Sequence, residues 1–402
     1  MKKFILGVLI AAIILVSTGG YYDAREIAHT VSVIALGIDK GENMPYRVSF
    51  QIERTGTGDG ADEESNEKEK SKDVISVEAP TVLSAFARAN SINSVDLSVA
   101  NVKMIIFSED IAKSGIAGAV SEIAAATEFK NNSYLAVSLR RAEDILKNVS
   151  PEDEEYISVY YEQIVLRHFK SATPHFLLSE TYFDIISEDG GDFVLPSVSE
   201  REKDGFENSF TDDTKSDLLA GMIPKESKHK VEFLGGAVFS EGKLKGYLTE
   251  SEMLALSFAG SFFAPRDISV NYPEGSDNFI TVRLKQPHNS KIKVNSGKVL
   301  TAEISTGLSS GYEYMGKGDY GNTSAEFTAY LESEIAKAME DVLYKCMMEY
   351  SSDVLSLNKY GRLRFLTENE MEKYNLREKM KSGKINCRVK IKSERNGRFT
   401  FL

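Results

Sequence analysis

The chain has 402 residues, which is enough for two or three domains, and its 42% hydrophobic content is typical of globular proteins. Lysine and arginine total 48 against 60 aspartate and glutamate residues, so the formal net charge is -12. This acidic balance argues against nucleic-acid binding and against electrostatic attraction to anionic lipid, because both need a basic surface.

The N-terminus has the charged, apolar and small-residue regions of an export signal. Lys2 and Lys3 precede an apolar run over residues 4–16, and small residues follow as far as Gly20. We therefore predict that residues 1–20 form a signal peptide or a membrane anchor. The apolar run is shorter than the roughly 20 residues that a membrane-spanning helix needs. If it continued to residue 22 and stayed uncleaved, it would just span a bilayer.

Gly20 stands where a bacterial lipoprotein signal has its cysteine. The preceding Ser17-Thr18-Gly19 resembles the approach to a lipoprotein cleavage site. In such a site the cysteine thiol accepts the diacylglycerol, so glycine at this position cannot be lipidated. We predict no lipidated residue, and two routes stay open: secretion after ordinary cleavage, and anchoring by an uncleaved helix.

Strand and helix patterns alternate through the first half of the chain. Residues 30–39 are apolar and β-branched and residues 46–53 alternate strictly, which predicts two antiparallel strands joined by a loop. Further strands are predicted at 74–77, 102–107 and 134–139, and helices at 81–92, 110–129, 142–147, 151–168 and 176–186. The alternation indicates α/β layers, and the hairpin makes the sheet mixed rather than purely parallel.

Residues 56–73 form an acidic insertion between two of these strands. The segment has seven acidic residues, three lysines and no large apolar residue, so it cannot bury enough surface to offset the entropy of ordering it. We predict a mobile loop. A calcium-binding loop is the alternative, but the ligand spacing of an EF-hand is missing.

The second half is again mixed. After a break at Gly190 and Gly191, residues 197–230 are polar and irregular, which is typical of an inter-domain linker. Strands are predicted at 231–239, 244–248, 279–284, 291–294, 299–304 and 385–391, and helices at 249–258, 323–350 and 367–379. We therefore predict an α+β fold of three mixed α/β domains with mixed or antiparallel sheets, over residues 21–190, 191–262 and 263–402.

Two motifs could carry chemistry, and neither is complete. Residues 307–311 match the G-x-S-x-G nucleophile elbow around Ser309, but no histidine follows His288 to complete the hydrolase order. A glycine–serine loop is the preferred interpretation. Residues 316–321 match G-x-G-x-x-G, but a dinucleotide site needs a strand immediately before it, and about a dozen loop-like residues intervene. We interpret this segment as a flexible turn.

The remaining reactive residues are scattered. No pair among the five histidines has the spacing of a metal motif. Cys346 and Cys387 lack CxxC spacing, so they form either two buried thiols or one disulfide. We predict no catalytic residue, no cofactor and no metal site.

Four blocks of sequence resemble the C subunit of bacterial spore germinant receptors, the GerAC-type family. The first runs from the signal into the motif residues Asp23, Arg25 and Glu26, and then into residues 35–40 with Gly37 and Asp39. The second is the glycine-rich stretch 235–248, with Gly235, Gly242 and Gly246. The third is the long helix ending near Tyr350-Ser351-Ser352-Asp353, and the fourth is the strand Val389-Lys390-Ile391.

The resemblance implies a non-enzymatic lipoprotein of three mixed α/β domains. Such a protein lies on the outer face of the spore inner membrane with two membrane-embedded subunits, of the A and B types, and helps to couple nutrient sensing to the release of ions and dipicolinate. Two positions depart from the family. Its lipid-accepting cysteine corresponds to Gly20, and its usual tryptophan corresponds to Tyr22.

Our hypothesis from the sequence is an exported, membrane-associated receptor subunit that works through protein–protein contact. The first alternative is an extracytoplasmic solute-binding protein, which needs a deep polar cleft between two similar lobes. The second is a secreted hydrolase that uses Ser309.

Overall fold

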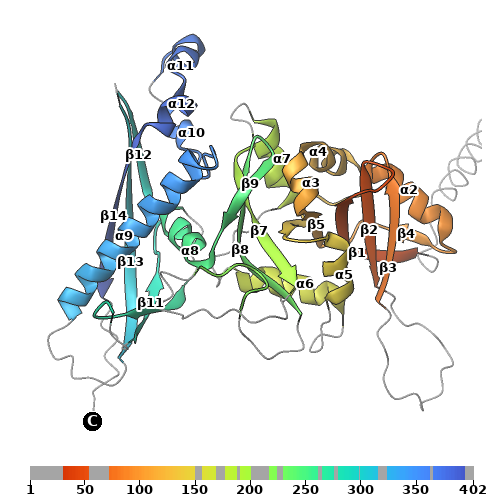
Figure 1. The fold of residues 1–402 in the computed structure, drawn as a ribbon, viewed down its shortest axis with the longest axis horizontal. Helices are drawn as coiled ribbons and strands as arrows, with labels where there is room; N and C mark the ends of the chain where they lie inside the picture. Colours follow the sequence, from red (N-terminus) through yellow and green to blue (C-terminus); the bar gives the residue numbers. More distant parts are fainter. Residues whose placement is uncertain are drawn as a thin grey trace, which may run out of the picture.

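The computed structural model describes residues 30–53, 72–149, 156–168, 177–187, 191–200, 217–223, 230–260, 265–275, 279–297, 299–315, 324–362 and 365–393. These residues form two β-sheets with their helices, one sheet toward each end of an elongated molecule (Figure 1). The predicted α+β fold with mixed sheets is confirmed. The predicted signal, Gly20, Asp23, Arg25 and Glu26 lie outside the described residues, as does most of the acidic insertion.

The first sheet has nine strands in the order β3-β2-β1-β5-β6-β7-β8-β9, with β4 also paired to β1. Its strands are β1 (Thr30–Lys40), β2 (Tyr46–Glu53), β3 (Lys72–Ala79), β4 (Asp96–Ser98), β5 (Met104–Ser108), β6 (Tyr134–Ser138), β7 (Phe193–Glu200), β8 (Val231–Ser240) and β9 (Lys243–Leu248). Strands β1, β5, β6 and β7 run parallel to their neighbours in this series, whereas the β1–β2, β2–β3, β7–β8 and β8–β9 pairs are antiparallel.

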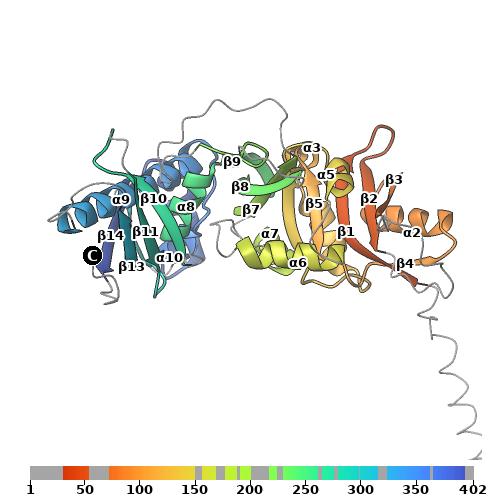
Figure 2. The ribbon, with the colours of Figure 1, turned by 90° about the horizontal axis from the view of Figure 1, so that it is seen from below.

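Helices cover both faces of this sheet (Figures 1 and 2). One face packs against α2 (Val82–Ile92), α3 (Glu109–Ser114), α4 (Ala117–Ala125) and α7 (Leu178–Ile186). The other packs against α5 (Ala142–Asn148) and α6 (Ile157–His168). Because β1 is buried on both faces, it is apolar almost throughout, as a central strand should be. Leu36 and Ile38 join the first cluster and Ala35 joins the second.

The second sheet has five strands. They are β10 (Arg266–Asn271), β11 (Phe279–Lys285), β12 (Lys291–Ser296), β13 (Leu300–Met315) and β14 (Lys384–Ser393). The path runs β10-β11-β13-β12, and β14 lies parallel to β13 on its other side. The long helix α9 (Ser324–Met348) lies across this sheet (Figure 1). Its apolar stripe is buried as predicted, for example at Phe327, Leu331 and Ile335.

Helix α8 (Glu250–Ala259) joins the two sheets. It is buried on nearly every side, which is expected of a helix that is apolar all round. Its residues belong to one hydrophobic cluster that also contains Val238 of β8, Ile304 of β13 and Met339 of α9. It begins with a capping box, in which the Thr249 hydroxyl accepts from the amide of Glu252.

Residues 197–200, predicted to open the irregular linker, are part of β7. Pro196 argues against a central strand because it has no amide hydrogen. The register of β7 against β8 shifts between Pro196 and Val198, so a bulge accommodates the proline. The predicted boundary at residue 191 falls between α7 and β7, and β7 to β9 continue the first sheet across it. The three-domain division stays a prediction.

Other predicted elements differ in length or continuity. The helix predicted at 110–129 is broken into α3 and α4 at Gly115, whose φ of 119° is outside the helical range. The helix predicted at 367–379 is divided into α11 (Glu368–Tyr374) and α12 (Leu376–Lys381) at Asn375, which is left-handed at φ 48°. Strands β4 and β10 and helix α10 (Leu357–Arg362) were not predicted, and β3 begins inside the predicted acidic loop, at Lys72.

Candidate functional site

Asp39 connects the end of β1 to the start of α5. Its two carboxylate oxygens accept hydrogen bonds from the backbone amides of Ala142 (2.8 Å) and Glu143 (2.9 Å), so Asp39 caps this helix from a distant part of the chain. The residue is only 2% exposed, and burial raises the pKa of its carboxyl despite the two amide hydrogen bonds. Gly37 faces the same helix, and a side chain there would press on Ala142 and Leu146.

Beside this cap, Glu143 forms ion pairs with three cationic side chains. Its carboxylate accepts from Arg47 Nε at 2.8 Å and Nη2 at 3.2 Å, and from Arg141 Nη2 at 2.8 Å. Lys147 Nζ at 2.7 Å and the Ser76 hydroxyl at 3.0 Å complete its contacts. The hydrogen bonds from Arg47 hold the pKa of Glu143 at about 2, against the opposing effect of burial. This cluster ties α5 to strands β2 and β3.

A cleft of about 390 Å³ opens beside the cap and the cluster. We call it the strand-end cleft, because it lies where the parallel strands β1, β5 and β6 end. Eleven residues line it, and all but Leu139 are polar or charged: Asp39, Lys40, Glu42, Arg47, Ser108, Glu109, Asp110, Leu139, Arg140, Arg141 and Asp144.

A second constellation lies at the β9 edge of the first sheet. Here the β8–β9 hairpin packs against residues 350–353, the segment that follows α9, and we call this contact the junction. Gly246 of β9 lies against the ring of Tyr350 so closely that a β-carbon would overlap the ring. The Tyr350 hydroxyl donates to the backbone carbonyl of Tyr247 at 3.1 Å.

Three further hydrogen bonds close the junction. The Ser240 hydroxyl donates to the carbonyl of Ser351 at 2.8 Å, and the Ser352 hydroxyl donates to the carbonyl of Phe239 at 2.6 Å. The amide of Asp353 donates to Asp192 Oδ2 at 2.8 Å. Because three consecutive residues of the segment, Ser351 to Asp353, each make one of these bonds, the bonds fix the position of the segment against the first sheet.

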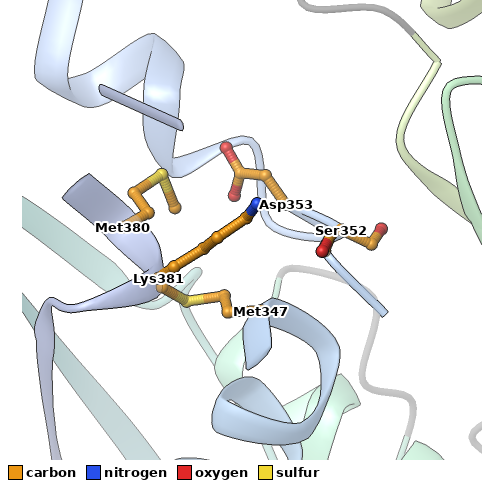
Figure 3. A pocket seen from close by; sticks show the side chains of 6 residues that line it. Met347, Ser352, Asp353, Met380 and Lys381 are labelled. Atoms are coloured by element: carbon orange, nitrogen blue, oxygen red, sulfur yellow. The ribbon is translucent and has the colours of Figure 1, made fainter. Parts of the chain in front are cut away.

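Asp353 also starts the next helix. Its carboxylate accepts from the amides of Leu357 (2.7 Å) and Asn358 (2.8 Å) at the first residues of α10. Figure 3 shows Ser352 and Asp353 on the loop after α9, with Lys381 and two methionines around a space of about 10 Å³. That volume holds about one water molecule, so this pocket is a packing gap rather than a ligand site.

An ion pair joins the junction to α8. Lys345 Nζ lies 2.7 Å from Glu252 Oε1, and it also lies 5.7 Å from the ring centroid of Tyr350. Burial is the largest single influence and disfavours the charge of Lys345, but the hydrogen bond and charge of Glu252, together with Tyr350, outweigh it and raise the pKa of the amine. Tyr350 is therefore held by β9 on one side and by α9 on the other.

Comparison with known families identifies the chain. Residues 23–200 match the family model described as "Spore germination protein N-terminal domain", and residues 234–397 match "Spore germination B3/ GerAC like, C-terminal". The chain belongs to the GerAC family of spore germination proteins. The resemblance predicted from the four sequence blocks is thus confirmed.

Individual relatives of this GerAC-family protein are distant in sequence. Spore germination protein KC of Bacillus subtilis (strain 168) is 26% identical over 157 residues, and the match spans 38% of either chain. The crystal structure of the GerBC protein covers 89% of this chain and 96% of its own, with a TM-score of 0.53 and 16% sequence identity. At that identity the likeness concerns the fold.

The GerAC-type motif residues fall into two separate places. Gly37 and Asp39 lie at the cap of α5. Of the glycines in the second block, Gly246 lies at the junction and meets Tyr350 of the third block, whereas Gly235 and Gly242 face other parts of the first sheet and its helices. Gly235 and Gly242 have positive φ values of 74° and 69°, which favour glycine, and the carbonyl of Gly242 accepts from the amide of Ile116. The described motif residues therefore comprise one capping carboxylate and several glycines at separate places in the fold, and they do not line one shared pocket.

Several residues of these places were not predicted from the sequence. Arg47, Ser108 and Glu143 belong to the cleft or the cluster beside it, yet no short motif contains them. The one available signal was the charged run Arg140-Arg141-Ala142-Glu143-Asp144 directly after a buried strand, where parallel strands expose their carboxyl ends.

Ser309 is not at a nucleophile elbow. It lies inside the continuous strand β13, paired with Lys285 of β11 and Lys392 of β14, and it is only 6% exposed. A nucleophile elbow needs a sharp turn from strand to helix that exposes the serine. The preferred glycine–serine loop is wrong as well, because residues 307–311 are strand. The G-x-G-x-x-G segment 316–321 lies outside the described residues.

Cys346 and Cys387 are both free and buried, which settles the disulfide question left open by the sequence. Burial raises the pKa of each thiol to about 12, so both are unreactive at neutral pH. No three His, Cys, Asp or Glu side chains of the described residues are arranged to hold a metal ion. None of the helices within the described ranges combines the length with the hydrophobicity that a bilayer crossing demands.

Proposed function

We propose that this chain is a non-enzymatic subunit of a spore germinant receptor complex and takes part in nutrient-triggered germination. One observation carries the proposal: the two GerAC-type matches follow each other over residues 23–200 and 234–397, nearly the whole chain. The partners would be the membrane-embedded A-type and B-type subunits. The burial of Ser309 in a strand and of both cysteine thiols supports a role without catalysis.

The direction of β1 suggests how the subunit would be oriented. We propose export to the outer face of the spore inner membrane, with the N-terminal segment toward the bilayer. From Thr30 the eleven residues of β1 extend about 35 Å before they reach the strand-end cleft. Because Ser32 pairs with Glu53 and Glu53 pairs with Lys72, the end of β2 and the start of β3 lie at the Thr30 end of the sheet. In this orientation the cleft faces away from the membrane.

The solute-binding alternative fits less well. Such proteins have two similar lobes around one deep cleft, whereas the two sheets here differ in strand number and order. The strand-end cleft also lies within the first sheet's own layers, not between the two sheets.

Gene deletion with complementation tests the proposed function. We expect deletion to abolish germination in response to at least one nutrient, and the wild-type gene to restore it. Complementation with Gly246→Leu should fail, because leucine cannot fit beneath Tyr350, whereas Gly307→Ala should succeed because no described atom lies within 4 Å of the added carbon. Immunoblots establish whether each variant accumulates. An unchanged response to every nutrient after deletion would contradict the proposal.

The anchoring route needs a separate experiment. Mass spectrometry of the mature N-terminus, combined with membrane fractionation, distinguishes a cleaved signal from a retained helix. A Gly20→Cys variant supplies the thiol that a lipoprotein signal needs. We expect this variant, and not the wild type, to incorporate radiolabelled palmitate. Incorporation by the wild type would overturn the prediction that position 20 is not lipidated.

A further inference from the structure

One face of the second sheet is open to solvent. Helices α8 and α9 pack against the other face, where the apolar side chains of the strands, such as Ile304 and Val389, form one cluster with them. Because side chains alternate across a strand, the residues between these point to the opposite face. There Ser305 and Gly307 of β13 are exposed, although β13 lies between β12 and β14. We call this surface of β12, β13 and β14 the open face.

The open face is rich in cations. Every second residue of β14 from Lys384 to Lys392 is exposed, and these positions extend about 26 Å along the strand. Two lysines of β12 lie on the same face, because they pair with Ser305 and Glu303 of β13. The open face thus has six exposed cations: Lys291, Lys293, Lys384, Arg388, Lys390 and Lys392.

Few acidic groups oppose these cations. Glu303, which is half-buried, is the one acid among the residues of β13 that pair with β12 or β14, and neither β12 nor β14 contains an acid. Lys390 pairs with Glu332 of α9 at 2.9 Å and is still 82% exposed. The other five cations make no ion pair within the described part of the chain. The net charge of -12 conceals this face, because a sum over the chain does not show where the charges lie.

The composition of the open face favours a lipid surface over a protein. The cores of protein–protein interfaces are enriched in aromatic side chains and depleted in lysine. The open face has the reverse composition, since β12, β14 and residues 300–310 of β13 contain no aromatic residue. Each lysine or arginine near an anionic membrane strengthens attachment about fivefold, and this attraction needs no close shape match. Long, flexible lysine side chains can reach one such surface together.

We propose that the open face of the second sheet binds the anionic head groups of a phospholipid membrane. The ammonium and guanidinium groups donate charge-assisted hydrogen bonds to phosphate oxygens. This contact brings the second sheet to the bilayer independently of the N-terminal segment. The proposal concerns lipid binding by this chain and does not rest on its assembly into a receptor.

A fluorophore on the open face tests the proposal. Ser305→Cys is labelled with nitrobenzoxadiazole maleimide in the full-length chain, and both native thiols are buried and unreactive. In vesicles with about 30% phosphatidylglycerol, we expect emission at least about twofold higher than in pure phosphatidylcholine. Salt at about 0.5 M should abolish the difference, since it shortens the screening length to about 4 Å. The same label at Asp341→Cys, on the exposed side of α9, should not respond.

Charge reversal locates the contact. Lys293→Glu combined with Arg388→Glu should weaken the contact at least about 20-fold and so remove the response of the label at position 305. Lys130→Glu combined with Lys337→Glu changes the total charge equally at exposed positions off the open face, and should leave the response unchanged. Circular dichroism melts establish that each variant folds.

Three outcomes would overturn the proposal. They are an equal signal in neutral and anionic vesicles, a response that survives reversal of Lys293 and Arg388, and a response to poly-L-glutamate but not to anionic vesicles, which would assign the open face to an acidic protein. A loss of germination on gene deletion would leave the receptor proposal standing in each case.

Discussion

Gly246 lies against the ring of Tyr350, and the hydroxyl of that ring donates to the backbone carbonyl of the next residue, Tyr247. The glycine belongs to the first sheet and the tyrosine follows the long helix of the second. The absence of a side chain at position 246 is therefore what lets the two parts of the molecule approach each other. In this chain the steric demand for glycine at position 246 comes from a residue 104 positions later.

Gly246→Ala tests this contact. The added methyl group would overlap the Tyr350 ring, so we expect the free energy of unfolding to fall by about 1–3 kcal/mol, as in other overpacked sites. In a Tyr350→Ala background the same substitution should cost much less, because the overlapping ring is gone. Urea unfolding of the four proteins of this double-mutant cycle measures the difference.

Gly307→Ala is the matched control for that experiment. Gly307 lies in β13, and no atom of the described residues lies within 4 Å of the β-carbon that alanine would add. Alanine should be neutral or more stable by about 0.5 kcal/mol, since glycine loses more backbone entropy in a strand. Equal destabilisation by both alanine variants would show that Tyr350 is not the cause.

Replacement of Asp39 by alanine should destabilise the chain more than replacement by asparagine. Asp39→Ala leaves the amides of Ala142 and Glu143 without their acceptors, and we expect a loss of about 1–2 kcal/mol of unfolding free energy. Asp39→Asn keeps one acceptor oxygen and removes a buried charge, so its loss should be smaller. Thermal unfolding at neutral pH compares the two, and the reverse order would argue against a capping role.

Glu143 should make the stability of the first sheet depend on pH in the acidic range. Its pKa is about 2 in the folded chain against a usual value of 4.5, so the cluster with Arg47 contributes fully above pH 4.5 and is lost as the pH falls toward 2. The shift corresponds to about 3 kcal/mol. Glu143→Gln should lower stability at pH 7 and flatten the curve between pH 2 and 4.5.

Asp341→Asn is the control for this acid dependence, because Asp341 is exposed on α9. Urea unfolding at a series of pH values should show the same slope for this variant as for the wild type. A wild-type curve that is flat below pH 4.5 would contradict the assignment of the cluster.

Local periodicity predicted most elements whose burial follows from their own sequence. The stripe of Phe327, Leu331 and Ile335 predicted α9, and the apolar run from Val31 to Ile38 predicted a strand. In each case a single amphipathic or apolar pattern determines which side chains leave water, so distant contacts add little to the prediction.

Prediction of secondary structure failed where a polar residue or a proline has its structural partner far away in the sequence. Residues 307–311 were predicted to form a loop because of their serine and glycine content, yet they are strand in β13. The Thr306 hydroxyl donates to the carbonyl of Phe258 in α8, 48 residues earlier. Likewise, Pro196 argues against a strand at β7, and the bulge that accommodates it is defined only by the pairing of β7 with β8. No local pattern contains these pairings.

The candidate site was predictable only in part. The motif supplied Gly37, Asp39 and Gly246 as positions, but not their neighbours α5 and Tyr350. The cleft combines residues from the ends of three strands that are dispersed over about a hundred positions, so its mixture of charges could not be read from any one segment. The site depends on which parallel strands are neighbours in the sheet, and the sequence pattern did not predict that order.

The outer edge of β14 is covered by side chains of α9. The amide of Ile385 donates to the Tyr344 hydroxyl, that of Cys387 to Glu340 Oε1, and that of Ile391 to Glu332 Oε1, all at 2.8–2.9 Å. Four helical residues rise about 6 Å and two strand residues about 6.6 Å, so the two repeats match along the edge. These side chains occupy amides that an added strand would otherwise use.

Glu340→Ala should therefore both destabilise the chain and promote association. We expect a loss of about 1.5–3 kcal/mol, the range for a hydrogen bond to a charged group, and concentration-dependent dimers through the exposed edge. Analytical ultracentrifugation detects the dimers, and Asp341→Ala, one residue along on the exposed face of the same helix, is the control. If Glu340→Ala stays monomeric while it is destabilised, the glutamate stabilises the packing of α9 on the sheet but does not prevent association through the edge of β14.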